Sequence, residues 1–111
     1  MSPLWLMIAA HALCDFPLQG DNMAQLKNRH TPVDPARVPP GQKPMVTWQY
    51  WLTAHALIHG LAVTLITGST VLGVAETVLH WLIDFAKCEN WTTIHTDQSL
   101  HVACKVAWSL L

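Results

Sequence analysis

The placement of polar residues inside long apolar segments constrains this sequence more than any other feature. Within each segment, His, Asp, Glu or Gln recurs at every third or fourth position. That spacing places side chains on one face of an α-helix, whereas a strand would alternate at every second position. The four sets are His11, Asp15 and Gln19; His55 and His59; Glu76, His80 and Asp84; and Asp97, Gln98 and His101. The pattern predicts four helices, each apolar except for one polar stripe.

The apolar segments have the length of helices, and polar or turn-forming residues separate them. We expect helices at about 3–19, 45–67, 71–88 and 97–111, with Pro17 marking a kink or end of the first and Thr96 or Asp97 as the N-cap of the last. Residues 68–70 form a joint so short that the two middle helices must make an antiparallel hairpin.

The connection between the first two expected helices is long and rich in proline. It holds five of the seven prolines, namely Pro32, Pro35, Pro39, Pro40 and Pro44. We expect an irregular loop at about 30–44, preceded by a short surface helix within 21–29. The chain is therefore predicted to be a single all-α domain, 1–111, folded as an up-down four-helix bundle.

Composition excludes several classes of protein. Hydrophobic residues make up 51% of the chain and charged residues 12%, which excludes an intrinsically disordered protein. The formal net charge of -1 argues against nucleic acid as a partner. Three widely spaced cysteines without a C-x-x-C pair indicate neither a disulfide framework nor a thiolate zinc site.

The apolar segments also approach the roughly 20 residues that a membrane-spanning helix needs. The first connection contains four basic residues, Lys27, Arg29, Arg37 and Lys43, and Lys87 lies at the start of the third connection, between the last two expected helices. By the positive-inside rule, connections 20–44 and 89–96 are expected to face the cytoplasm from the inner membrane, with lipids as partners. A compact soluble bundle with unusually apolar helices is the alternative.

In an up-down arrangement, the four polar stripes fall in the same half of the bundle and form one interior cluster. Buried carboxylates and imidazoles are costly unless they pair or bind an ion. We expect the cluster to hold one or two divalent cations, with zinc fitting best and manganese or iron as alternatives. The expected ligands are His11, Asp15, His55, His59, His80, Asp84 and His101. The alternative is an ion-free network in which histidines and carboxylates neutralise one another.

Several blocks of the sequence carry a family resemblance. They are His11-x-x-x-Asp15-Phe16-x-Leu18-Gln19, Met23-Ala24-x-x-Lys27-Asn28, His55-x-x-x-His59, His80-x-x-Ile83-Asp84-x-x-Lys87 and Asp97-Gln98-x-x-His101. In this order they resemble the domain-of-unknown-function 3307 family of small bacterial and phage proteins. The resemblance covers nearly the whole chain and implies a helical, membrane-associated protein. A more distant likeness, to LexA-regulated membrane-bound proteins regarded as metal-dependent hydrolases, implies hydrolase chemistry by analogy only.

Two functions of different classes follow from these observations. The first is a metal-dependent hydrolase, in which the ion lowers the pKa of a bound water toward about 7. Glu76 or Asp97 would then act as general base, and Lys87 would stabilise negative charge on a small anionic phosphate or acyl substrate. The second is a non-enzymatic membrane protein that acts through a host membrane protein or as a homo-oligomer, with a purely structural polar cluster. A soluble metal-binding bundle is a third.

Overall fold

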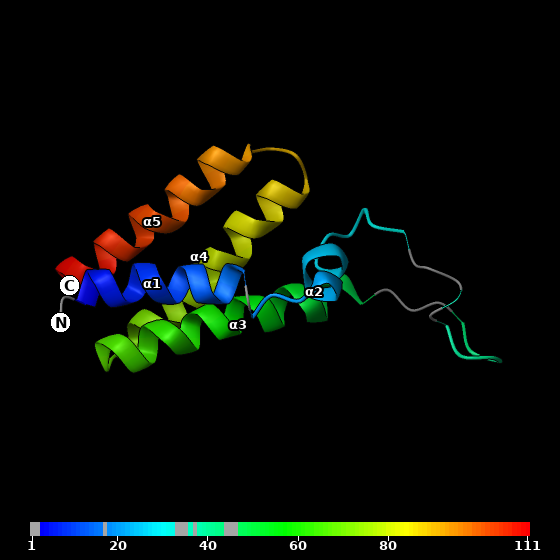
Figure 1. Cartoon of the computed structure of the whole chain (residues 1–111), viewed down its shortest axis with the longest axis horizontal. Helices are drawn as coiled ribbons and strands as arrows, with labels where there is room; N and C mark the ends of the chain where they lie inside the picture. Colours follow the sequence, from blue (N-terminus) through cyan, green and yellow to red (C-terminus); the bar gives the residue numbers. More distant parts are fainter. Residues whose placement is uncertain (1–2, 17, 33–35, 37, 44–46) are drawn as a thin grey trace.

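The computed structural model describes residues 3–16, 18–32, 36, 38–43 and 47–111, and its regular elements are all helices (Figure 1). In chain order they are α1 (Pro3–Asp15), α2 (Asp21–Leu26), α3 (Trp48–Thr67), α4 (Thr70–Cys88) and α5 (Ile94–Leu110). The described residues contain no strand, so the prediction of an all-α fold is confirmed.

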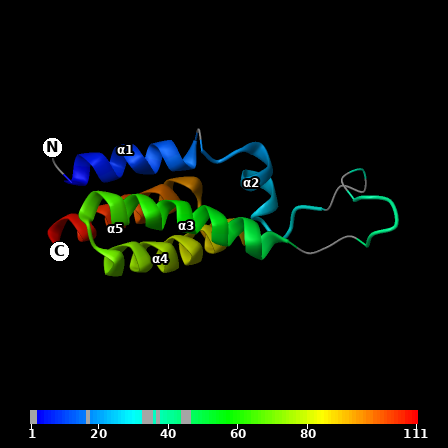
Figure 2. The ribbon, with the colours of Figure 1, turned by 90° about the horizontal axis from the view of Figure 1, so that it is seen from below.

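The four long helices form a closed ring of contacts. Helix α3 packs against α1 and α4, and α5 packs against α4 and α1, while the short α2 lies against the end of α3. Figures 1 and 2 show that α1 begins and α5 ends at the same end of the molecule, whereas α2 lies toward the opposite end. The arrangement resembles a helical bundle, and the polar stripes of the four helices meet inside the ring.

A tight joint connects α3 to α4, as expected. Gly68 ends α3 in the left-handed conformation with φ of 71°, and its N–H donates to the Thr64 carbonyl. Ser69 then caps α4 by accepting a hydrogen bond from the Leu72 N–H at 3.2 Å. Glycine reaches this φ at no steric cost, which is why the hairpin closes over so few residues.

Helices α3 and α4 approach one another at the level of their backbones. A Cβ atom on Gly60 would lie 2.7 Å from the Gly73 carbonyl oxygen, and one on Gly73 would lie 2.8 Å from that of Gly60. Thr64 and Thr77 complete the crossing, because their hydroxyls donate to these same two carbonyls at 2.9 Å. Small residues at a helix crossing permit this close approach, which brings the polar stripes of α3 and α4 into contact.

Two helix boundaries differ from those expected. Helix α1 ends at Asp15 rather than near 19, and the Gln19 side chain folds back to donate to the Asp15 carbonyl at 2.9 Å. The residue before a proline is disfavoured in a helix, which explains the early end, although Pro17 itself lies outside the described residues. Helix α5 begins three residues earlier than expected because Thr93, rather than Thr96 or Asp97, is its N-cap.

The long connection agrees with expectation where it is described. Helix α2 falls within the expected 21–29, and residues 30–32, 36 and 38–43 form no α-helix or strand. The parts of the expected loop at 33–35, 37 and 44, including Pro35, Arg37 and Pro44, lie outside the described residues, as does the expected helix start at 45.

The distribution of polarity is inverted relative to an ordinary globular protein. Among the described residues, ten polar or charged residues are buried but only five apolar ones. Large apolar side chains cover the outside instead, and Leu57, Leu61 and Leu65 on α3 are each more than half exposed. By length and composition, α3 is the one described helix that could cross a membrane, with a mean hydropathy of 1.3 over its most apolar window.

Candidate metal centre

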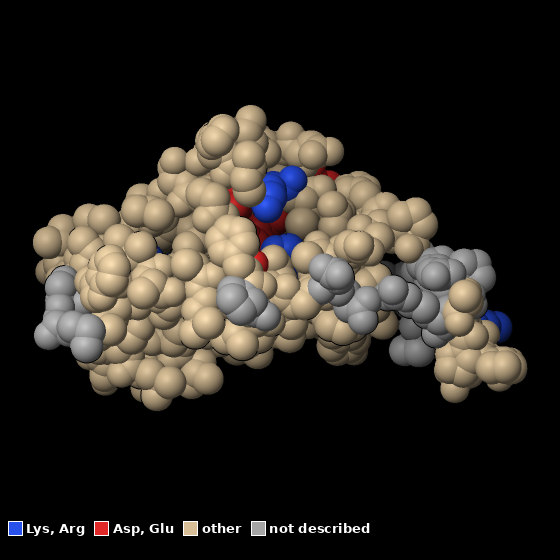
Figure 3. Space-filling model, in the orientation of Figure 1, with Lys and Arg blue, Asp and Glu red and all other residues tan. Residues whose placement is uncertain are grey.

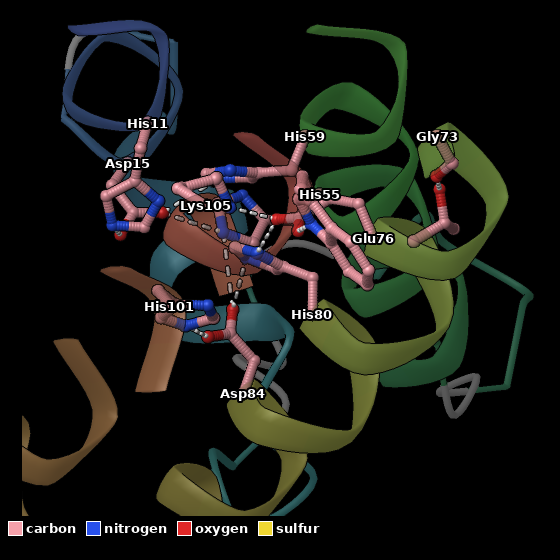
Figure 4. A network of polar contacts seen from close by, with 12 residues as sticks. His11, Asp15, His55, His59, Gly73, Glu76, His80, Asp84, His101 and Lys105 are labelled. Carbon is pink, nitrogen blue, oxygen red and sulfur yellow. Dashed lines mark hydrogen bonds and ion pairs between the residues drawn. The ribbon is translucent and has the colours of Figure 1, made fainter. Parts of the chain in front are cut away.

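The interior of the ring is a cluster of imidazoles and carboxylates from four helices (Figure 4). Helix α1 contributes His11 and Asp15, α3 His55 and His59, α4 Glu76, His80 and Asp84, and α5 Asp97 and His101. All are buried except Asp15, whose side chain is 11% exposed. The helical spacing of the sequence therefore does bring these side chains toward a common interior.

One group of possible ligands surrounds the carboxylate of Asp15. Its Oδ1 atom lies 2.9 Å from Nε2 of His59 and 3.3 Å from Nε2 of His55. With His80, these residues each offer a ligand atom within 4.8 Å of the others. The His59 and His80 rings are stacked, with centroids 3.7 Å apart. The set of three imidazoles and one carboxylate comes from α1, α3 and α4.

A second group is built around Asp84 and shares His80 with the first. Nε2 of His101 donates to Asp84 Oδ1 at 3.0 Å, and Asp84 Oδ2 lies 3.5 Å from Nε2 of His80. His80, Asp84 and His101 thus offer ligand atoms within 4.8 Å of each other. The same Oδ2 atom is also 3.2 Å from Nε2 of His55, so Asp84 links the two groups.

The imidazole nitrogens are close to carboxylate oxygens without being aimed at them. Nε2 of His55, His59 and His80 are all buried and have no hydrogen-bond partner among the described residues, despite the short distances above. Two donors that are each about 2.05 Å from a tetrahedral zinc ion lie about 3.3 Å apart. Within the Asp15 group, the separations of 2.9 and 3.3 Å between Asp15 Oδ1 and the His59 and His55 nitrogens are close to this value. The donor set fits a divalent metal ion.

His11, an expected ligand, lies outside both groups. Its Nε2 donates to Oε1 of Gln98 at 3.0 Å and lies 3.2 Å from Asp15 Oδ2. Because this nitrogen donates to Gln98, and Gln98 in turn donates to Asp15 Oδ2, His11 is linked to the Asp15 carboxylate through Gln98, while its Nδ1 atom has no hydrogen-bond partner among the described residues.

The three residues expected to act in catalysis occupy different surroundings. Glu76 is fully engaged, because Oε1 accepts a hydrogen bond from Lys105 and Oε2 accepts one from Trp108 Nε1 at 2.7 Å. Asp97 is buried, and its Oδ1 atom has no hydrogen-bond partner among the described residues. Lys87 is partly exposed.

A cavity of about 220 Å³ adjoins the cluster at the end nearest α2. Its walls are formed by Asp15, Phe16, Gln19, Lys27, Asp84, Lys87, Ile94, Asp97 and Gln98. Figure 3 shows blue and red atoms gathered in one hollow of an otherwise largely uncharged face. Asp97 and Lys87 therefore line an accessible space beside the possible ligands, whereas Glu76 does not.

No protein-family model matches this chain, and no curated protein or solved structure is significantly similar to it. The resemblance to the domain-of-unknown-function 3307 family stays a prediction.

Sequence reasoning missed one residue of the site, Lys27, and placed Gln98 on a polar stripe without giving it a role. Lys27 was assigned to the polar connection, yet it is buried and donates to Asp84 Oδ2 at 2.9 Å. Gln98 donates to Asp15 Oδ2 at 3.3 Å and to Asp97 Oδ2 at 3.2 Å. Both residues lie in the sequence blocks that carry the family resemblance, and that was the available signal. Their partners are distant in sequence, so helical periodicity could not reveal the contacts.

A separate ionic contact lies outside the cluster, at the end of α4. Arg29 donates to both carboxylate oxygens of Glu89, and His30 lies 2.9 Å from Oε2. Hydrogen bonds from Arg29, and then from His30, lower the pKa of Glu89 to about 2. This contact fastens the connection that follows α2 to the end of α4.

Proposed function

We propose that this chain is a membrane-embedded metal-binding protein whose four long helices form an up-down bundle around one divalent cation. Asp15, His55, His59 and His80 are the proposed ligands, with Asp84 and His101 beside them. The observation that carries the proposal is the group of three buried Nε2 atoms without hydrogen-bond partners, next to a carboxylate. Leaving such atoms unsatisfied is costly, and one ion would engage all of them.

The charges inside the ring are compatible with one divalent cation when the imidazoles are neutral. Four interior carboxylates face two buried ammonium groups. The carboxylates are those of Asp15, Glu76, Asp84 and Asp97, and the ammonium groups are those of Lys27 and Lys105. With neutral imidazoles, two negative charges remain uncompensated, which is the charge of one divalent cation. A low-dielectric interior tolerates such a deficit poorly, so the count favours one ion over two.

The donor types favour zinc among the candidate metals. Three imidazole nitrogens and one carboxylate oxygen, all within 4.8 Å of one another, are ligands that zinc accepts. Manganese and iron prefer more ligands or open octahedral positions and remain alternatives. Magnesium and calcium are disfavoured because three of the four donors are nitrogens.

The inverted polarity supports placement in a membrane. Exposed apolar side chains on the outside would contact lipid, while the polar interior would be satisfied within the bundle. Helix α3 has 20 residues and α4 has 19, so each is nearly 30 Å long, about the thickness of the bilayer core. Connections 20–44 and 89–96 would face the cytoplasm with the basic residues.

The site is also suited to hydrolysis of a phosphate- or ester-containing substrate. When bound, the ion would supply a water of lowered pKa as a fifth ligand, because the four proposed residues already fill a tetrahedron. Asp97 is better placed than Glu76 to accept the proton from such a water, since its Oδ1 is free of hydrogen bonds and its side chain lines the cavity. Lys87 lines the same cavity and would stabilise negative charge on the substrate.

A specific observation favours the non-enzymatic alternative. Lys27 and Lys105 already neutralise Asp84 and Glu76, which is how an ion-free structural network would begin. Protonation of two histidines would complete the neutralisation without a metal. In that case the protein would act through a membrane partner, and the cluster would only hold the helices together.

Elemental analysis of the membrane-extracted protein separates these two functions. We expect about one equivalent of zinc in the wild-type chain, none in His59→Ala or His80→Ala, and full retention in the control His95→Ala, because His95 is exposed. Circular dichroism would verify that each variant is folded. A folded wild-type chain that neither carries nor takes up metal would refute metal binding, and recovery of the chain from the soluble fraction without detergent would refute membrane embedding.

A further inference from the structure

The cavity beside the cluster contains a cation without a partner. Lys87 lines the cavity, and the described residues place no carboxylate oxygen within ion-pair distance of its ammonium group. The other lysine of the cavity, Lys27, is bound to Asp84. One ammonium group is therefore available to an anionic ligand at this position.

The cavity also contains an acceptor without a donor. Asp97 is only 1% exposed, and its Oδ1 atom has no hydrogen bond among the described residues, because the imidazole nitrogen 3.4 Å away, Nε2 of His101, donates to Asp84 instead. A ligand that satisfies both Lys87 and Asp97 must carry a negative charge and an O–H group. Hydrogen phosphate has both features, and a phosphate monoester has both in its singly protonated form, which is populated at and below its second pKa of about 6, whereas phosphate diesters lack the O–H group.

The mouth of the cavity suits a ligand that joins a charged group to an apolar chain, as a lipid at the bilayer surface does. Phe16 and Ile94 form part of its wall and are 69% and 50% exposed. Such apolar side chains beside a charged cavity suit the junction between a headgroup and its chain. The volume of about 220 Å³ is below that of a site for a drug-sized ligand, which fits a headgroup.

The acidic walls make anion binding conditional. Asp15, Asp84 and Asp97 would repel an anion, since their negative charges outnumber the positive charges of Lys27 and Lys87. A divalent cation held at Asp15 would reverse this balance. Occupancy of the metal site should therefore precede occupancy of the cavity.

We propose that this cavity binds the phosphate monoester group of an anionic ligand, with Lys87 as its cationic contact and Asp97 as the acceptor for its O–H group. The inference rests on the proposed metal site, because the acidic walls become attractive to an anion only with the cation bound. It adds a substrate class to that site.

Calorimetric titration of inorganic phosphate into the full chain in mild detergent tests the inference. We expect phosphate to bind to the zinc-loaded wild-type chain and not to the chelator-treated chain. In zinc-loaded Lys87→Gln we expect the phosphate affinity to fall at least about tenfold, because charged hydrogen bonds are the stronger ones. Lys43→Gln is the matched control, since Lys43 is exposed in the α2–α3 connection, outside the cavity, and should bind as wild type does.

A second arm uses vesicles of phosphatidylcholine with and without phosphatidic acid, measuring their effect on phosphate binding by the reconstituted chain. Competition by phosphatidic acid but not by phosphatidylcholine would support the monoester and identify a headgroup as a source. If zinc binds but phosphate does not, or if Lys87→Gln and wild type bind equally, the inference fails while the metal site stands. If zinc does not bind, the proposed function fails first.

Discussion

Helix α4 carries two buried carboxylates two turns apart, and their surroundings differ. Glu76 accepts one hydrogen bond from a lysine and one from a tryptophan, and a single imidazole nitrogen, Nδ1 of His80, lies 3.4 Å from its Oε1. Asp84 accepts a hydrogen bond from Lys27 at Oδ2 and one from His101 at Oδ1. Nε2 of His55 and Nε2 of His80 also lie within 3.5 Å of Oδ2. Glu76 lies away from the cavity, whereas Asp84 forms part of its wall.

The groups that surround each carboxylate distinguish a structural polar pair from a binding site on the same helix face. A carboxylate whose acceptor sites are filled by fixed donors stabilises the packing of α4 against α5. A carboxylate close to several imidazole nitrogens that make no hydrogen bond can share an additional cation with them. The predictions below test this division at the two positions.

The largest effect should follow from breaking the Glu76 pair. Lys105→Met leaves a buried carboxylate without its cation, so we expect a loss of about 3–5 kcal/mol in unfolding free energy. Denaturant unfolding of the reconstituted chain measures it. The double variant Glu76→Gln with Lys105→Met should recover most of the loss, because no buried charge then remains. If the double variant is as unstable as the single one, Glu76 does not act as a paired structural group.

The corresponding change at the other carboxylate should act on metal binding. We expect Asp84→Asn to weaken zinc affinity by about 10- to 100-fold, the range for groups that support a metal site. Competition with a chelating dye measures the affinity. Glu76→Gln is the matched comparison at the structural carboxylate and should change zinc affinity much less. Equal losses in the two variants would remove the distinction between these carboxylates.

Moving α3 away from α4 should affect both regions at once. Gly60→Ala forces a Cβ atom against the Gly73 carbonyl, and we expect a loss of about 1–3 kcal/mol from overpacking. Zinc affinity should also fall, because His59 precedes this crossing and His80 follows it. Gly20→Ala provides the control, since a Cβ at Gly20 meets nothing within 4 Å. A neutral Gly60→Ala result would show that the two backbones are not in contact.

The smallest effect concerns the exposed carboxylate that follows α4. The pKa of Glu89 falls from its usual 4.5 to about 2 in the folded chain. A depressed pKa stabilises the fold above the unfolded value, so this contribution is complete above pH 4.5 and lost as the pH falls toward about 2. Protection against hydrogen exchange at residues 27–32, measured relative to the intrinsic rate at each pH, should fall as the pH is lowered across that window. Glu89→Gln should show fast exchange throughout, and identical pH profiles would contradict the contact.

Much of the fold could be predicted from local patterns. The apolar segments with their four-residue polar spacing predict the long helices, and Gly68 predicts the hairpin between α3 and α4. The boundaries near Asp15 and Thr93 were missed, because several residues near each end can cap or terminate a helix. For Thr93, the hydroxyl that accepts from the Thr96 N–H decides the start of α5.

The candidate site was predictable as a set of residues but not as an arrangement. Each expected ligand lies on a helix face that the sequence already displays. The burial of Lys27 depends on how α2 packs against α3, and the closure of Glu76 by Lys105 and Trp108 depends on the register between α4 and α5. Neither packing relationship leaves a periodic signal in the chain.

The sequence by itself determined that this protein is helical and that its polar groups lie on one stripe of each helix, because both properties follow from spacing along one chain segment. The packing of the helices sets the donors of each carboxylate: Glu76 meets Lys105 and Trp108, whereas Asp84 meets Lys27 and His101 with two further imidazoles close to Oδ2. It also placed Asp97 and Lys87 at a cavity. These outcomes depend on distances between helices, and the packing of α3 against α4 at Gly60 and Gly73 is one of the contacts that set them.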